Sequence, residues 1–175
     1  DPGNAHIIFG RTEGFGALID YDSLDGADGF SIAGLAIADQ MGSEISTEGD
    51  FNGDGIDDLL VTVRGDDIAE YGAGSAYVVF VKTTGFGADV DITTLDGSDG
   101  FQVFGLDNAG INSNMGEGDN VGDFNGDGID DMFFGTRQGF SGVIFGKTDA
   151  FSKTVDFRTI TAAEGEEFTT SRDSS

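Results

Sequence analysis

The sequence predicts an all-β fold built from repeating units of four strands. Its composition, its internal repeats and its short apolar runs each support this prediction. The chain of 175 residues contains 30 Gly and 16 Phe but only one Pro. So many glycines without a collagen-like period indicate frequent tight turns between short strands. The sequence shows no convincing amphipathic helix, which favours an all-β protein over a helical bundle.

Two long segments of the chain recur. Residues 14–30 (GFGALIDYDSLDGADGF) are closely matched by residues 85–101 (GFGADVDITTLDGSDGF), and GDFNGDGIDD at residues 49–58 is repeated without change at residues 122–131. Three related apolar segments, HIIFGRTEGF, YVVFVKTTGF and GVIFGKTDAF, begin at His6, Tyr77 and Gly142. Repeats of this kind indicate that one structural unit is used several times along the chain.

Each repeated unit contains short runs with the character of β-strands. Residues 100–105 (GFQVFG) alternate with a period of two residues and are bounded by Gly, as expected of a half-buried strand. Further strands are expected at Ser43–Glu48, Leu59–Val63, Ala76–Val81, Asn120–Gly122, Met132–Phe134 and Val143–Phe145. Four strands per unit is the composition of a β-propeller blade, so the chain would hold about two and a half blades. These would cover residues 5–34, 41–105 and 114–172, with Glu167–Thr170 as the last strand.

The charge and the residue types that are missing exclude several functions. The chain has 33 acidic and eight basic residues, a formal net charge of −25 that repels nucleic acid and anionic membrane surfaces. No apolar run approaches the roughly 20 residues that span a bilayer, so we expect no membrane insertion. The chain has no Cys, and His6 is its only His, which leaves little material for nucleophilic catalysis. We therefore predict that the chain is not an enzyme and has no catalytic residues.

Two identical loops of sequence DFNGDGIDD carry the clearest chemistry: loop 1 is Asp50–Asp58 and loop 2 is Asp123–Asp131. Calcium takes six to eight oxygen ligands at about 2.3–2.6 Å. Side chains at loop positions 1, 3 and 5 can converge on one ion, because Gly at position 6 permits the necessary bend. Position 7 then offers its backbone carbonyl, and Asp at position 9 closes the shell. The predicted calcium ligands are Asp50, Asn52, Asp54, Ile56 and Asp58 in loop 1, and Asp123, Asn125, Asp127, Ile129 and Asp131 in loop 2.

Two other interpretations of these loops are disfavoured. An EF-hand needs an acidic residue at position 12, where this chain has Val61 in one copy and Phe134 in the other. A purely polar turn would leave several carboxylates crowded together without a cation, in two identical copies. The position-8 residues, Asp57 and Asp130, are expected to point away from the ion because side chains alternate in direction.

The loop, the apolar strand after it and the segments VVFV or VIFG resemble the FG-GAP repeats of integrin α-subunit propellers and their bacterial relatives. The Phe-Gly pair is present at Phe9-Gly10 and Phe145-Gly146, while the middle copy reads Phe80-Val81. The Gly-Ala-Pro element keeps only its Gly, at Gly135, in the last copy and nothing in the middle one. The LDGxDGF stretches are most similar to bacterial members of the family.

The resemblance implies a β-propeller in which each loop joins the first two strands of a blade and calcium stiffens that hairpin. It divides the chain into the C-terminal half of one blade (residues 1–40) and two blades with calcium loops (residues 41–113 and 114–175). Such propellers close with about seven blades. We therefore expect flanking repeats of a longer protein, or else other chains, to complete the ring.

These features together predict a calcium-binding module, with two calcium sites, that acts in interaction or adhesion. We expect it to be secreted to the cell surface or extracellular space, or to the periplasm, and to bind a protein or glycan. Two alternatives stay open: a structural subunit or spacer of an extracellular assembly, and a non-catalytic part of a secreted hydrolase. Residues 64–66 spell Arg-Gly-Asp, the tripeptide that integrins recognise, but a three-residue match arises easily in this composition.

Overall fold

The computed structural model describes residues 2–35, 40–63, 74–83, 85–104, 115–136 and 140–169. In these ranges the chain forms strands joined by loops, with only two short 3-10 turns, η1 (Tyr21–Ser23) and η2 (Ile92–Thr94). The predicted all-β class is therefore confirmed. The tripeptide at residues 64–66 lies outside the described residues.

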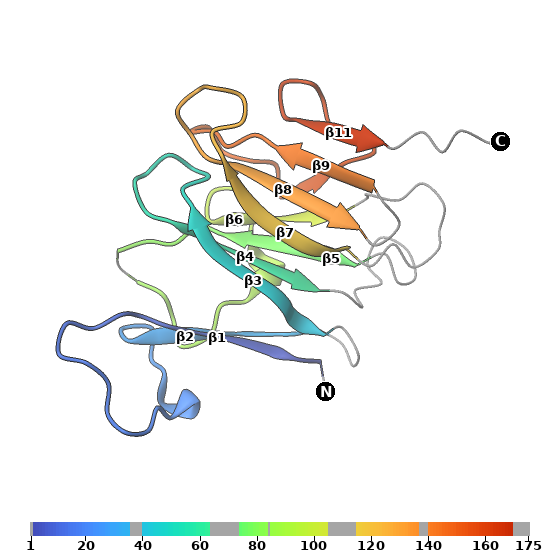
Figure 1. Cartoon of the computed structure of the whole chain (residues 1–175). Coiled ribbons are helices and arrows are strands. Elements are labelled where there is room, and N and C mark those ends of the chain that lie inside the picture. Colours follow the sequence, from blue (N-terminus) through green and yellow to red (C-terminus); the bar gives the residue numbers. More distant parts are fainter. Residues whose placement is uncertain are drawn as a thin grey trace.

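The strands form three sheets that lie side by side without closing into a ring (Figure 1). The first sheet pairs β1 (Asn4–Ile8) with β2 (Gly29–Ala33). The second sheet has the order β3 (Met41–Gly49), β4 (Asp58–Val63), β5 (Ser75–Val79), β6 (Gly100–Phe104), β10 (Thr154–Asp156). The third sheet has the order β7 (Met115–Gly122), β8 (Asp131–Thr136), β9 (Phe140–Ile144), β11 (Gly165–Thr169).

The pairing within the second and third sheets follows the blade pattern expected from the sequence. Four strands run antiparallel in each, and the last strand of the third sheet, β11, includes the expected segment up to Thr169. β10 is an addition that the sequence did not suggest: it pairs in parallel with β6, although it follows β9 along the chain. The chain therefore leaves the third sheet after β9, adds β10 to the second sheet, and returns to the third sheet with β11. The division at residues 40 and 113 stays a prediction.

Two strands end earlier than expected. The sequence placed Ala76–Val81 and Val143–Phe145 in strands, but β5 ends at Val79 and β9 at Ile144. Each strand ends opposite the start of its partner, since Val79 pairs with Leu59 of β4 and Ile144 pairs with Met132 of β8. The Val81 N–H donates to a carboxylate oxygen of Asp58 at 2.9 Å, and the Phe145 N–H donates to the Glu164 carbonyl at 2.9 Å.

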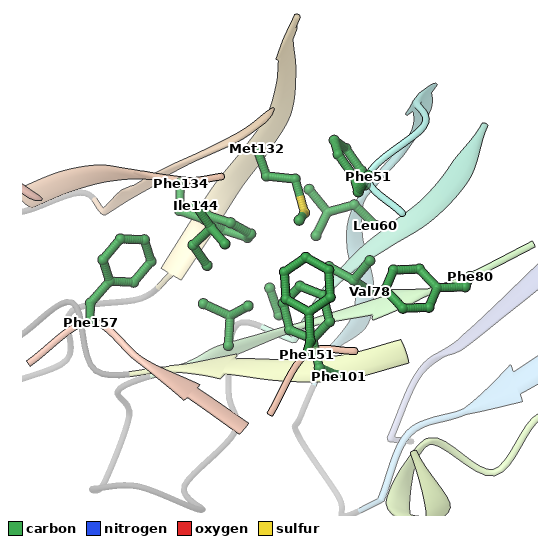
Figure 2. Packing of buried hydrophobic residues seen from close by; sticks show 12 residues of the cluster. Phe51, Leu60, Val78, Phe80, Phe101, Met132, Phe134, Ile144, Phe151 and Phe157 are labelled. Atoms are coloured by element: carbon green, nitrogen blue, oxygen red, sulfur yellow. The ribbon is translucent and has the colours of Figure 1, made fainter. Parts of the chain in front are cut away.

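β4 is buried on both faces of the second sheet, which explains its apolar run. Leu60 points toward the third sheet and belongs to a cluster with Phe51, Met132 and Phe134 (Figure 2). The remaining members of this cluster are Ala76, Val78, Phe80, Phe101, Val103, Ile144, Phe151 and Phe157. Leu59, Val61 and Val63 point the other way, into a second cluster shared with the first sheet. Removing apolar side chains on both faces from water stabilises the stack of sheets.

The repeated LDGxDGF stretches pack one unit against the next. Gly97 has a φ of 98°, and a Cβ at this position would lie 1.9 Å from the Phe151 carbonyl oxygen. Gly26 has the same relation to the Phe86 carbonyl oxygen. Only glycine allows both the left-handed conformation and so close an approach of another backbone. The glycine of this motif therefore serves packing between repeats.

Candidate metal centre

Loop 1 joins β3 to β4, and loop 2 joins β7 to β8, so each loop connects the first two strands of its sheet. Both loops project from the same end of the stacked sheets (Figure 1). The connection implied by the family resemblance is thus the one observed. The hairpins place all predicted ligands of one loop on a single turn of the backbone.

Loop 1 is wound around its own side-chain oxygens. Asp50 accepts hydrogen bonds from the Asp54 N–H at 3.0 Å and from the Gly55 N–H at 2.8 Å. The side-chain oxygen of Asn52 also accepts from the Asp54 N–H, at 2.9 Å. Asp54 in turn accepts from the Ile56 N–H at 2.9 Å. The side chains at positions 1, 3 and 5 therefore all turn toward the backbone of their own loop.

Loop 2 repeats these four hydrogen bonds. Asp123 accepts from the Asp127 N–H and the Gly128 N–H, both at 2.8 Å. Asn125 accepts from the Asp127 N–H, and Asp127 accepts from the Ile129 N–H, both at 2.9 Å. Two copies of one sequence thus adopt one local fold in different surroundings.

The bend of each loop uses two glycines rather than the one that sequence reasoning assigned. The position-6 glycines, Gly55 and Gly128, have φ values of 88° and 93°. The position-4 glycines, Gly53 and Gly126, have φ values of 73° and 82°. Positive φ is strained for other residues, so both positions favour glycine. The signal was present in the sequence, since Gly53 and Gly126 belong to the repeated motif.

The position-9 aspartates are buried and join the loop to the segment that follows β5 or β9. The Asp58 carboxylate accepts from the Phe51 N–H at 3.0 Å and from the Val81 N–H at 2.9 Å. Asp131 makes the equivalent bonds, accepting from the Phe124 N–H at 2.8 Å and the Gly146 N–H at 2.9 Å.

Electrostatics distinguish these two aspartates from exposed carboxylates. Burial raises the pKa of Asp58 to about 7, although the Val81 and Phe51 N–H groups act to lower it; Asp54 and Asp50 raise it further. Burial likewise raises the pKa of Asp131 above its usual range. A nearby cation would favour the ionised form and so oppose the effect of burial.

The donor chemistry of each loop fits calcium. The predicted ligands of each loop are three carboxylates, one amide oxygen and one backbone carbonyl within nine residues, and all are hard oxygen donors. A carboxylate oxygen that accepts one N–H keeps a further lone pair for another partner. In the described ranges, however, no three His, Cys, Asp or Glu side chains are grouped around a common point as in an assembled metal site. The structure therefore brings the predicted ligands onto one turn without gathering three carboxylates around a centre.

The two position-8 residues differ from one another. Asp57 of loop 1 is exposed. Asp130 of loop 2 is half-buried, and its carboxylate accepts from the Asp50 N–H and from the side-chain amide of Asn120, both at 3.3 Å. Asp130 therefore contacts the first residue of loop 1. Sequence reasoning missed this contact, because the two loops are identical and nothing in the motif distinguishes Asp130 from Asp57.

The fold and these loops define an all-β repeat protein with propeller-type blades. Residues 41–79, which include β3, loop 1, β4 and β5, match the family model of the FG-GAP repeat. The resemblance noted in the sequence is thus confirmed over this unit. None of the curated proteins matches the chain. Among the described helical turns, none has the length and apolar character needed to cross a membrane.

Proposed function

We propose that this chain is a calcium-binding FG-GAP module that acts in extracellular or cell-surface interaction, with one calcium ion in each loop. The observation that carries the proposal is the shared conformation of loops 1 and 2. In both, the side chains at positions 1, 3 and 5 turn onto the same bend, and the position-9 aspartate lies beneath it. Both copies thus present the same set of hard oxygen donors on the same bend, which is the donor type that calcium prefers.

In loop 1 the ion would be held by Asp50, Asn52, Asp54, Asp58 and the Ile56 carbonyl; in loop 2 by the equivalent residues from Asp123 to Asp131. Bound calcium supplies positive charge that offsets the repulsion between these carboxylates. Asp58 also accepts hydrogen bonds from the Phe51 N–H in the loop and from the Val81 N–H, two residues beyond β5. Ordering Asp58 would therefore stiffen the hairpin together with the neighbouring strand.

The proposed role is binding and not catalysis. The single His leaves little material for nucleophilic catalysis. The net charge of −25 disfavours nucleic acid and anionic membranes as partners, which leaves a protein or a glycan. The stacked sheets are a scaffold from one end of which loops 1 and 2 project, and binding residues are commonly placed on loops of this kind.

One observation favours a structural role in an assembly as the second candidate. Phe124 of loop 2 is exposed and lies against Phe168 of β11, with ring centroids 6.2 Å apart. Its counterpart Phe51 is covered by the third sheet. A further blade of the same kind could cover Phe124 in the same manner, which would suit a subunit or spacer.

Isothermal titration calorimetry with CaCl₂ tests the proposal. We expect binding in the range of about 10⁻⁴–10⁻³ M that is typical of extracellular calcium modules. Sedimentation velocity at several protein concentrations separates the two candidate roles. A chain that stays monomeric fits an interaction module, whereas concentration-dependent association that Phe124→Asp abolishes fits an assembly subunit. Absence of calcium binding would contradict both loops' proposed role.

A further inference from the structure

Loop 1 is held from outside by the third sheet. The Asp50 N–H donates to the Asp130 carboxylate at 3.3 Å, and the Lys147 N–H donates to the Phe51 carbonyl at 3.0 Å. These bonds fix the first two residues of loop 1, one of which is a predicted calcium ligand. The third sheet therefore restrains the part of the loop where the metal site begins.

A third contact restrains the bend itself. A Cβ on Gly53 would lie 3.0 Å from the Thr148 methyl group and 3.5 Å from the Ile129 side chain. In loop 2, the equivalent Gly126 has open space around it among the described residues, with nothing within 4 Å of such a Cβ. The third sheet thus approaches loop 1 at its position-4 glycine, whereas the position-6 glycines, Gly55 and Gly128, are equally open among the described residues.

Asp130 is itself oriented by the third sheet. Its carboxylate accepts from the side-chain amide of Asn120 at 3.3 Å, and the Asn120 side-chain oxygen accepts from the Gly122 N–H at 2.6 Å. Asn120 in turn packs beside Gly49, where a Cβ would lie 3.1 Å from its amide carbon. Asp130 is thereby directed at Asp50 by neighbours of its own sheet.

We propose that Asp130 is a positioning residue for the calcium site of loop 1, so that loop 1 binds calcium more tightly than loop 2 despite their identical sequence. The inference rests on the calcium binding proposed above. A loop that is already restrained loses less conformational freedom on binding, which increases affinity. Loop 1 thus has the Asp130 carboxylate at Asp50 in addition to its own position-8 carboxylate, Asp57.

Site-resolved calcium titration by ¹⁵N–¹H NMR tests this inference on the whole chain. The backbone amides of Gly55 and Gly128 report on loop 1 and loop 2 separately. In the wild type we expect the Gly55 signal to reach half-saturation at a lower calcium concentration than the Gly128 signal. In Asp130→Asn we expect the midpoint at Gly55 to rise roughly two- to fivefold, the size of one partly exposed charge interaction.

Two controls separate positioning from general loss of structure or charge. Asp57→Asn removes the exposed carboxylate at the same loop position, and should raise the Gly55 midpoint less than Asp130→Asn does. Melting of Asp130→Asn in EDTA should match that of the wild type, because Asn can still accept from the Asp50 N–H. A raised Gly55 midpoint with an unchanged calcium-free melting temperature supports a positioning role.

The failure of this inference is distinguishable from failure of the proposed function. If neither Gly55 nor Gly128 responds to calcium, the proposed calcium binding is wrong. If both respond but their midpoints are equal in the wild type, or Asp130→Asn leaves the Gly55 midpoint unchanged, calcium binding stands and the proposed role of Asp130 is wrong.

Discussion

Loop 1 and loop 2 have the same nine residues and the same internal turns, but they differ in what lies next to them. Phe51 in loop 1 is 1% exposed because the third sheet covers it, whereas Phe124 at the same position in loop 2 is 53% exposed. The conformation of the loop is thus local, since identical residues fold alike in both settings. The burial of its aromatic residue is not local, because it depends on the presence of an adjacent sheet.

The largest expected difference between the loops lies in this aromatic pair. Phe51→Ala removes a ring packed against Leu60 and Met132 and should lower the free energy of unfolding by about 3–5 kcal/mol. Phe124→Ala removes an exposed ring and should cost under about 1 kcal/mol. Urea unfolding of both variants measures the difference. Equal losses would mean that the packing of loop 1 does not stabilise the fold more than that of loop 2.

The next largest effect concerns the aspartate at position 9. Asp58→Ala leaves the buried Phe51 N–H and the half-buried Val81 N–H without their acceptor, which should cost about 2–4 kcal/mol even in EDTA. Asp57→Ala is the matched control, since that side chain is exposed, and should change stability by less than about 0.5 kcal/mol. Thermal melting in EDTA measures both. A tolerated Asp58→Ala would show that its hydrogen bonds do not hold the hairpin to β5.

Removing calcium should have a moderate effect on the whole chain. Binding at about 10⁻⁴ M would contribute about 1.4 kcal/mol per site at 1 mM calcium, so two occupied sites should raise Tm by roughly 6–11 °C. Melting curves with CaCl₂ and with EDTA, at equal ionic strength, provide the measurement. MgCl₂ serves as the control cation because its octahedral preference suits these loops less well. Superimposable curves in calcium and EDTA would identify the loops as ordinary turns.

The smallest effects are expected from single ligand substitutions. Asp54→Ala and Asp127→Ala each remove the position-5 oxygen of one loop, and each should abolish only that loop's contribution of about 1.4 kcal/mol. The loss should be local, because repeat units contact mainly their neighbours. Limited proteolysis in calcium would reveal cleavage in the altered hairpin alone. Assays with glycan and ester substrates should show no turnover, and turnover lost in either variant at unchanged stability would contradict a non-catalytic role.

The strands and the loop connections could be predicted because their signals are local. Alternation marks β6, and the repeated motif locates loops 1 and 2 between strands. Contacts between repeats could not be predicted in the same way. β10 follows β9 of the third sheet along the chain but pairs with β6 of the second sheet, and Asp130 contacts Asp50, 80 positions apart along the chain. Such contacts depend on how the sheets stack, and identical loop sequences contain no information about which copy has a neighbour.

The central claim is that both loops bind calcium, and the most direct measurement is the number of ions bound per chain. Equilibrium dialysis against ⁴⁵Ca²⁺ at saturating calcium should give two ions per wild-type chain. It should give one ion for Asp54→Ala and one for Asp127→Ala, since each substitution removes a ligand from a different loop. Binding of no calcium by the folded wild-type chain, or binding that both substitutions leave at the wild-type number, would contradict the account.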